Sequence, residues 1–160
     1  MEKVKLQAQY GLYINGEWRN ASDGATYNAE SPADGSHLAV CAQGSREDVE
    51  AASAAAWEAF KTWKKTTPAQ RAALLNKIAD IIDANKEHLA MVESMDNGKP
   101  IRETMNVDIP MAAEHFRYFA GCILAEEGQA SVLNEQFLSI ILREPIGVVG
   151  QIIPWNFPFL

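Results

Sequence analysis

Two prolines near the end of the sequence bracket an aromatic residue and an asparagine. The segment runs Gly150-Gln151-Ile152-Ile153-Pro154-Trp155-Asn156-Phe157-Pro158. Pro154 and Pro158 restrict the backbone on both sides of the turn. An asparagine amide can donate a hydrogen bond to an oxygen that becomes anionic during a reaction. The spacing is therefore compatible with an oxyanion-stabilising Asn156, and it leaves open the alternative of a turn around a core tryptophan.

Other residue types that often carry chemistry occur without a supporting pattern. A catalytic cysteine needs an electropositive, partly exposed setting. Cys41 follows a strand-like run and Cys122 lies on a predicted helix, so we interpret both as small buried hydrophobic residues. The histidines lack metal-ligand spacing and are interpreted as structural or surface residues: His37, His88 and His115. The sequence contains no G-x-G-x-x-G, Walker or G-x-S-x-G motif.

Composition excludes several classes of function. The 160 residues fit one domain or part of a larger one, and 48% hydrophobic with 22% charged residues excludes a disordered chain. Fourteen basic against 21 acidic residues give a net charge of −7, which argues against nucleic acid or an anionic membrane as partner. No apolar run approaches the ~18 residues of a membrane span. With two cysteines and no secretory pattern, we expect a cytoplasmic protein.

The elements that must position the proline-bracketed turn begin with short strands. Asn15-Gly16 predicts a type I′ hairpin over Tyr13–Trp18, because both residues tolerate positive φ. Further turns are predicted at 22–24 and 31–35, and strands at 27–30 and 37–41.

Helices are predicted between residues 45 and 128. Ser45 is an N-cap followed by acidic residues, and Thr67-Pro68-Ala69-Gln70 combines a cap, a first-turn proline and a capping-box glutamine. The third helix should end at Asn97-Gly98, where glycine can adopt the left-handed conformation. Pro110 should kink or split the fourth helix, because it has no N–H to donate.

The last part of the sequence predicts strands. Phe137–Arg143 is one candidate, and the nearly continuous apolar run Ile146–Ile153 is typical of a strand buried on both faces of a parallel sheet. No other segment supplies a parallel neighbour, so we predict the first strand of a larger α/β sheet, with Asn156 at its ligand-binding carboxyl end. The alternative is a small protein that pairs Ile146–Ile153 with a partner chain.

These segments resemble, in unbroken order over about residues 10–160, the NAD(P)-dependent aldehyde dehydrogenases. The stretch from Glu144 to Pro158 resembles a family signature, and Tyr13–Trp18 resembles the opening hairpin. Further similar stretches are Asn28–Gly35 and Asp96-Asn97-Gly98-Lys99-Pro100. Residues 101–104 and 115–120 are most similar to the bacterial acetaldehyde branch.

The resemblance implies an α/β fold, namely the N-terminal part of the three-layer aldehyde dehydrogenase fold. Residues 1–126 would form the hairpin and helices of the cofactor-binding domain. Residues 127–145 would form the strands of the arm that joins subunits in a homo-oligomer, either a dimer or a tetramer. Residues 146–160 would form the first strand of the cofactor-binding sheet and the start of the active-site loop.

The resemblance also implies a mechanism: a cysteine thiolate attacks the aldehyde, hydride passes to the nicotinamide, and a glutamate-activated water hydrolyses the thioester. Asn156 matches the oxyanion-stabilising asparagine. Four residues match positions that line NAD, with NADP left open: Ile152, Ile153, Pro154 and Trp155. The Glu30 carbonyl and Asp108 match a monovalent-cation site outside the active site.

Neither cysteine matches the family's nucleophile, which is expected downstream together with the glutamate base. We therefore expect the parent enzyme to oxidise an aldehyde, with a short aliphatic one favoured, and the 160-residue chain alone to be inactive. The alternative is a non-catalytic short product that docks on other subunits through Phe137–Arg143.

Overall fold

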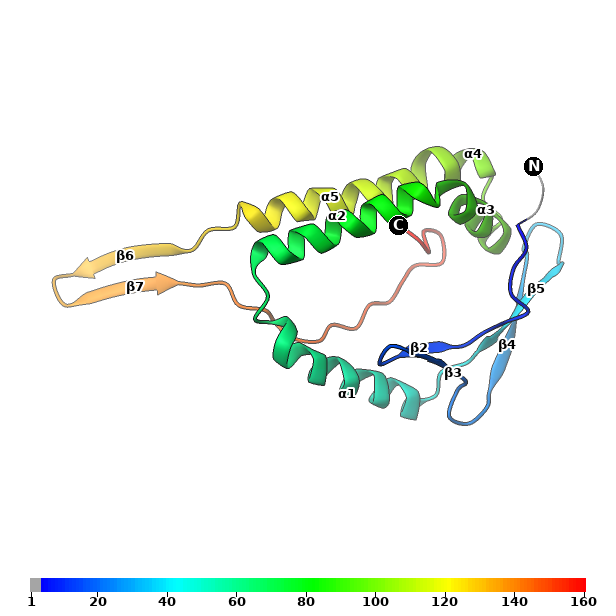
Figure 1. Cartoon of the computed structure of the whole chain (residues 1–160), viewed down its shortest axis with the longest axis horizontal. Coiled ribbons are helices and arrows are strands. Elements are labelled where there is room, and N and C mark those ends of the chain that lie inside the picture. The colour runs from blue at the N-terminus through cyan, green and yellow to red at the C-terminus, as the bar shows by residue number, and fades with distance from the viewer. Residues whose placement is uncertain (1–3) are drawn as a thin grey trace.

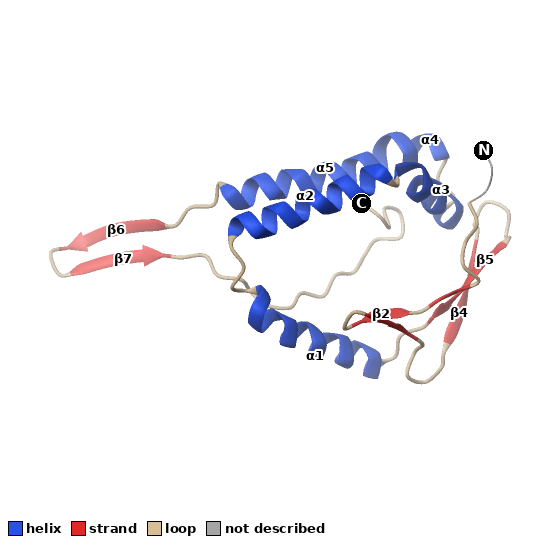
Figure 2. Cartoon of the chain, viewed as in Figure 1, coloured by secondary structure: helices blue, strands red, loops and turns tan. Residues whose placement is uncertain are grey.

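The computed structural model describes residues 4–160, which form three regions in sequence order (Figure 1). Short strands gather at one end, a group of helices occupies the middle, and a long hairpin projects beyond the helices at the other end. Figure 2 shows that the final segment, after the hairpin, returns past the helices as loop.

The N-terminal strands form two small sheets. β2 (Leu12–Ile14) and β3 (Glu17–Arg19) pair antiparallel, and both turn residues have positive φ, 55° at Asn15 and 84° at Gly16. This confirms the predicted type I′ hairpin. The second sheet has the order β1-β5-β4, formed by Gln9–Tyr10, His37–Ala42 and Thr26–Glu30.

Helix α1 (Arg46–Trp63) begins at the predicted cap. Ser45 and Asp48 form a reciprocal capping box, and the buried Asp48 carboxylate also accepts from the backbone N–H of Ser22 at 3.1 Å. These backbone hydrogen bonds, Ser45 first, lower the pKa of Asp48. One side chain thereby joins the start of α1 to the turn before β4.

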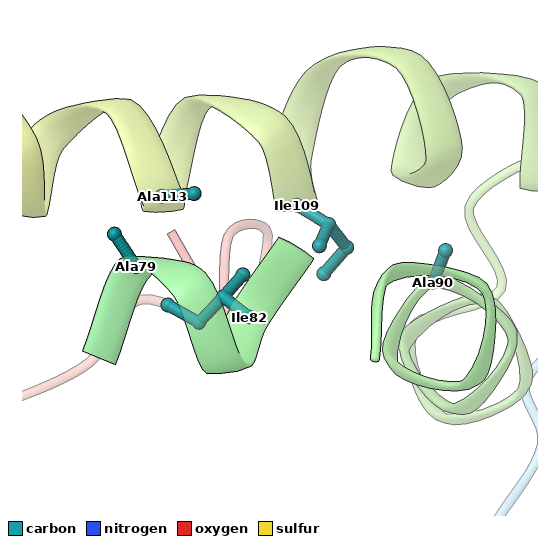
Figure 3. Close-up of a cluster of buried hydrophobic side chains, with 5 residues drawn as sticks. All are labelled: Ala79, Ile82, Ala90, Ile109 and Ala113. Atoms are coloured by element: carbon teal, nitrogen blue, oxygen red, sulfur yellow. The ribbon is translucent and has the colours of Figure 1, made fainter. Parts of the chain in front are cut away.

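The core lies where α2 (Pro68–Ala84), α3 (Lys86–Asn97) and α5 (Ile109–Leu124) meet. Figure 3 shows small side chains facing one another across α2 and α5, with an isoleucine closing the gap to α3. Small residues let α2 and α5 lie close together. The buried cluster consists of Ala79, Ile82, Ala90, Ile109 and Ala113.

A π-helical turn separates α4 (Ile101–Glu103) from α5. In this turn, η1 (Thr104–Asp108), the N–H of Ile109 bonds to the Thr104 carbonyl five residues back. Pro110, which has no N–H to donate, sits in the first turn of α5. The sequence predicts that Pro110 kinks or splits this helix; the helix runs on without a break, and the irregularity before Pro110 is the π turn.

The projecting hairpin joins β6 (Gln129–Asn134) to β7 (Phe137–Ile141). The Asn134 side-chain oxygen accepts from the N–H groups of Gln136 and Phe137, at 2.9 and 3.1 Å, which closes the turn. Apolar side chains on both strands are exposed, among them Val132 at 77%.

The segment Ile146–Ile153 forms no paired strand among residues 4–160, so its place as the first strand of a larger sheet stays a prediction. The segment is extended without sheet pairing, and Ile146 and Ile152 are 90% and 99% exposed. A strand forms only beside another strand, and the described residues place none along this segment. The ring of Trp57 on α1 lies against Gly147, where a Cβ would come within 2.7 Å of it.

None of the helices among residues 4–160 combines the length and apolar character that crossing a membrane requires.

Candidate functional site

The proline-bracketed turn lies against the loop that follows α3. The Asn97 side-chain N–H donates to the Trp155 carbonyl at 2.7 Å, and the Lys99 ammonium donates to the Asn156 carbonyl at 2.9 Å. The N–H of Phe157 bonds back to the Pro154 carbonyl at 3.4 Å. These contacts join two segments that lie almost 60 residues apart in the sequence. One is the predicted helix end at residues 97–99 and the other is the predicted site at residues 154–158, and together they form one unit.

The Lys99 ammonium lies at the centre of this unit. It pairs with the Asp108 carboxylate, and it lies 3.9 Å from the centre of the Phe157 ring. The side chains of Asp108 and Lys99 are 2% and 17% exposed. A cation with so little access to water needs an anion beside it, and Asp108 in the π turn supplies that charge.

Gly98 sets the course of this loop. It ends α3 in the left-handed conformation with φ 77°, as predicted, and its N–H bonds to the Ser94 carbonyl. The Ser94 hydroxyl then donates to the Lys99 carbonyl at 2.6 Å. A Cβ at Gly98 would lie 2.8 Å from Pro32, so glycine also lets this helix end approach the turn before β5.

The Asn156 side chain is exposed, and within the described residues its amide has no hydrogen-bond partner. Its backbone is fixed by Lys99 while its amide stays free to donate. An amide without a partner is available to donate to an oxygen as it becomes anionic.

The residues expected to line a dinucleotide form a row of exposed, mostly apolar side chains before Asn156. Ile152 is 99%, Ile153 56% and Trp155 87% exposed, and Pro154 is exposed beside them. Apolar side chains that stand open to solvent can cover the faces of flat rings, so their chemistry fits a nucleotide.

Glu30 and Asp108, predicted to share a monovalent cation, have different surroundings. Glu30 is exposed at the end of β4 and lines a cavity of about 710 Å³ between the N-terminal strands, α3 and the final residues. Asp108 is buried, and its carboxylate forms an ion pair with the Lys99 ammonium. Among residues 4–160, no cluster of three or more acidic, histidine or cysteine side chains could hold a metal ion. The shared cation site stays a prediction.

Glu93 is a buried acid beside this unit. Its side chain is on α3, the residue is 5% exposed, and neither carboxylate oxygen has a hydrogen-bond partner. Burial raises the pKa of Glu93 to about 7; the neighbouring Asp108 adds to the rise, and Lys99 opposes it. Glu93 is therefore about half protonated near pH 7 and becomes largely protonated as the pH falls below it.

Replacing Glu93 with glutamine is expected to stabilise the protein at pH 8. The folded-state pKa, about 7, lies above the ordinary value of 4.5, so wild-type stability is full below pH 4.5 and falls as the pH rises through 7. Glutamine stays neutral and removes that loss. The melting temperature at pH 8 should rise by at least about 2–4 °C, the shift that 1 kcal/mol produces at this size.

The gain should shrink towards pH 5, where the wild-type acid is itself neutral. Melting curves from pH 5 to 8 measure this, with the exposed Glu114→Gln on α5 as the matched control. An equal shift of the melting temperature at pH 5 and pH 8 would contradict the raised pKa.

The two cysteines lie in different settings. Cys41 on β5 is half-buried beside Tyr27, and Cys122 on α5 is exposed beside Tyr118. The interpretation of Cys122 as a buried hydrophobic residue is wrong, because its side chain is exposed near the end of α5.

Sequence reasoning missed the supporting residues of the site. Asn97 stood out as a predicted helix end, Lys99 only as part of a family-like stretch, and Glu93 drew no attention. The available signal was the composition of the helix end, where two polar side chains flank a left-handed glycine and can reach outward.

Known proteins are similar in sequence to this chain over nearly its whole length. The family model described as "Aldehyde dehydrogenase family" matches residues 18–160. A long-chain-aldehyde dehydrogenase of Acinetobacter is 49% identical over 99% of this chain and 31% of its own length. An acetaldehyde dehydrogenase of Pseudomonas aeruginosa is 47% identical over 98% of this chain and 31% of its own. The chain thus spans about a third of the length of these curated relatives.

Solved structures agree in fold. PnpE in complex with nicotinamide adenine dinucleotide has a TM-score of 0.91 at 43% identity, over 94% of this chain and 31% of its own. An NAD-dependent aldehyde dehydrogenase of Sinorhizobium meliloti has a TM-score of 0.91 at 38% identity, over 97% of this chain and 32% of its own. These matches confirm the predicted α/β fold, as its N-terminal third. With the family model covering most of its residues, the chain belongs to the aldehyde dehydrogenase family.

Proposed function

We propose that the complete protein containing this chain oxidises an aldehyde to a carboxylic acid with NAD as the electron acceptor. The observation that carries the proposal is the turn around Asn156, whose backbone is held by Asn97 and Lys99 while its amide stays free. The family membership of the chain supports the same reaction.

Asn156 would act when a thiolate adds to the aldehyde. The carbonyl oxygen then gains negative charge, and the exposed amide can donate a hydrogen bond that strengthens as the charge grows. The thiolate and the base that activates water would come from other parts of the complete protein. This chain contributes the oxyanion donor and its support.

The cofactor would lie along the apolar row formed by Ile152, Ile153, Pro154 and Trp155. NAD would accept the hydride that leaves the substrate carbon. The exposed side chains of the row would cover ring surfaces and exclude water from them. A relative in structure, PnpE, is described as a complex with this dinucleotide, which supports NAD for this chain; NADP is the second candidate.

For the substrate we propose a short aliphatic aldehyde. The acetaldehyde dehydrogenase of Pseudomonas aeruginosa supports this choice, and the long-chain-aldehyde enzyme of Acinetobacter, similar to the same degree, supplies the competing one. We place the enzyme in the cytoplasm, where two free thiols such as Cys41 and Cys122 are usual.

The test is an assay of the complete protein for NADH formation with straight-chain aldehydes of increasing length. We expect kcat/KM to be highest for the shortest members. A maximum at long chains would reject the substrate class alone, whereas no NADH from any aldehyde would reject the reaction.

The β6–β7 hairpin is proposed as the arm that joins subunits of a homo-oligomer. One of its faces carries Val132, Leu138 and Ile140, each at least 60% exposed, and both strand edges lack a partner among the described residues. Exposed apolar side chains beside open edges favour pairing with another chain.

Changing Leu138 and Ile140 together to glutamate is expected to weaken assembly of the complete protein by more than tenfold. Both charges would be buried at the interface without partners, which costs several kcal/mol. Sedimentation velocity over a range of concentrations measures the effect. Ser131→Glu, on the opposite face of β6, is the control. Unchanged assembly of the double variant would show that the arm does not join subunits.

A further inference from the structure

One ammonium group ties three parts of the chain together. Lys99 follows α3, Asp108 belongs to the π turn before α5, and Asn156 and Phe157 belong to the proline-bracketed turn. The ammonium pairs with the Asp108 carboxylate, donates to the Asn156 carbonyl at 2.9 Å and lies 3.9 Å from the Phe157 ring centre.

These contacts suit a lysine. An ammonium has three N–H donors on one small group, and here they meet a carboxylate, a carbonyl and the negative face of an aromatic ring. Asp108 is 2% exposed and therefore keeps its place. Since the lysine backbone is itself held by the Ser94 hydroxyl, both ends of the side chain are fixed.

The Asn156 carbonyl belongs to the same residue as the candidate oxyanion donor. Fixing this carbonyl limits rotation of the residue's backbone, and Pro154 and Pro158 restrict the chain on both sides. The amide of Asn156 has no partner of its own among residues 4–160, so the backbone that Lys99 holds determines where this side chain leaves the turn and which positions its amide can reach.

We propose that Lys99 is a positioning residue for the reaction: anchored by Asp108, it holds the Asn156 carbonyl so that the Asn156 amide points at the developing oxyanion. The inference rests on the proposed function. It predicts an effect on kcat that operates through Asn156. A lysine that only stabilised the fold would lower the melting temperature without such a link.

The kinetic test is a double-mutant cycle in the complete protein. Lys99→Met keeps the length of the side chain and removes the charge. A displacement of about 1 Å at a reacting group can cost roughly 100-fold, so we expect kcat to fall by about that factor, with KM for NAD little changed. In an Asn156→Ala background the same substitution should lower kcat by less than about threefold, because the donor that it positions is already gone.

Three further variants sharpen the cycle. Lys99→Arg keeps the charge and should restore part of kcat. Arg102→Met removes a neighbouring cation whose side chain is 81% exposed and should leave kcat unchanged. If Lys99→Met leaves Asp108 too costly to bury and the protein fails to fold, Lys99→Met combined with Asp108→Asn removes both charges and serves for the same measurements.

A second readout does not depend on activity. Amide hydrogen exchange over residues 154–159 should become faster in Lys99→Met and stay unchanged in Arg102→Met. Unchanged exchange overturns the proposal. A fall in kcat from Lys99→Met that is as large in the Asn156→Ala background as in the wild-type protein also overturns it. If the wild-type protein forms no NADH, the proposed function fails, and hydrogen exchange still decides whether Lys99 holds the turn.

Discussion

Asn156→Ala in the complete enzyme is expected to lower kcat by about 100- to 1,000-fold, the usual effect of removing one oxyanion donor. The hydrogen bond strengthens only as the aldehyde oxygen gains charge, so its loss falls on the transition state rather than on binding of the cofactor. Steady-state kinetics with varied aldehyde and varied NAD measure both effects on one preparation.

Trp155→Ala is the matched control, because Trp155 is the preceding residue and is 87% exposed. It should raise KM for NAD and leave kcat closer to wild type. The alternative reading of Asn156 is that it only holds the turn between Pro154 and Pro158. In that case Asn156→Ala would lower the melting temperature and leave kcat within a few-fold of wild type, and the catalytic assignment would be withdrawn.

The 160-residue chain prepared by itself is expected to oxidise no aldehyde with NAD. Covalent catalysis needs a thiolate, and its loss removes the route of the reaction rather than a factor in its rate. Cys41 is half-buried on β5 in the cavity that Pro158 also lines, and Cys122 is exposed near the end of α5; each lies beside a tyrosine, and neither matches the family's nucleophile. NADH formation by a homogeneous preparation measures this.

A variant of the same chain with both cysteines changed to alanine is the control. Any trace activity shared by the two preparations belongs to a contaminant. Turnover by the unmodified chain that disappears when Cys41 or Cys122 is replaced would refute the expectation and would identify a nucleophile within these 160 residues.

Local features of the fold could be predicted from the sequence, because short-range chemistry determines them. Asn15-Gly16 must turn with positive φ, Ser45 and Thr67 must satisfy the free N–H groups of a helix start, and Gly98 can end a helix in the left-handed region. At each of these positions the structure shows the predicted geometry.

Features that depend on distant parts of the chain could not be predicted. The contact of Lys99 with Asn156 joins positions 57 residues apart, and no periodicity marks it. The raised pKa of Glu93 arises from burial that only the assembled helices create. Ile146–Ile153 has the composition of a buried strand, but composition supplies no neighbour, and a strand cannot form without one.

Helix α5 separates the proposed subunit arm from the turn that carries the proposed oxyanion donor. Asp108, which anchors the Lys99 contact, immediately precedes its first residue, and the β6–β7 hairpin follows its last. Sixteen residues at 1.5 Å each separate the two by about 24 Å. Lys99 links the Asn156 turn to the start of α5, where Ile109 is buried in the apolar core. Because the packed core around Ile109 lies between the exposed hairpin and Asn156, we expect motion of the hairpin to be damped before it reaches the Asn156 turn.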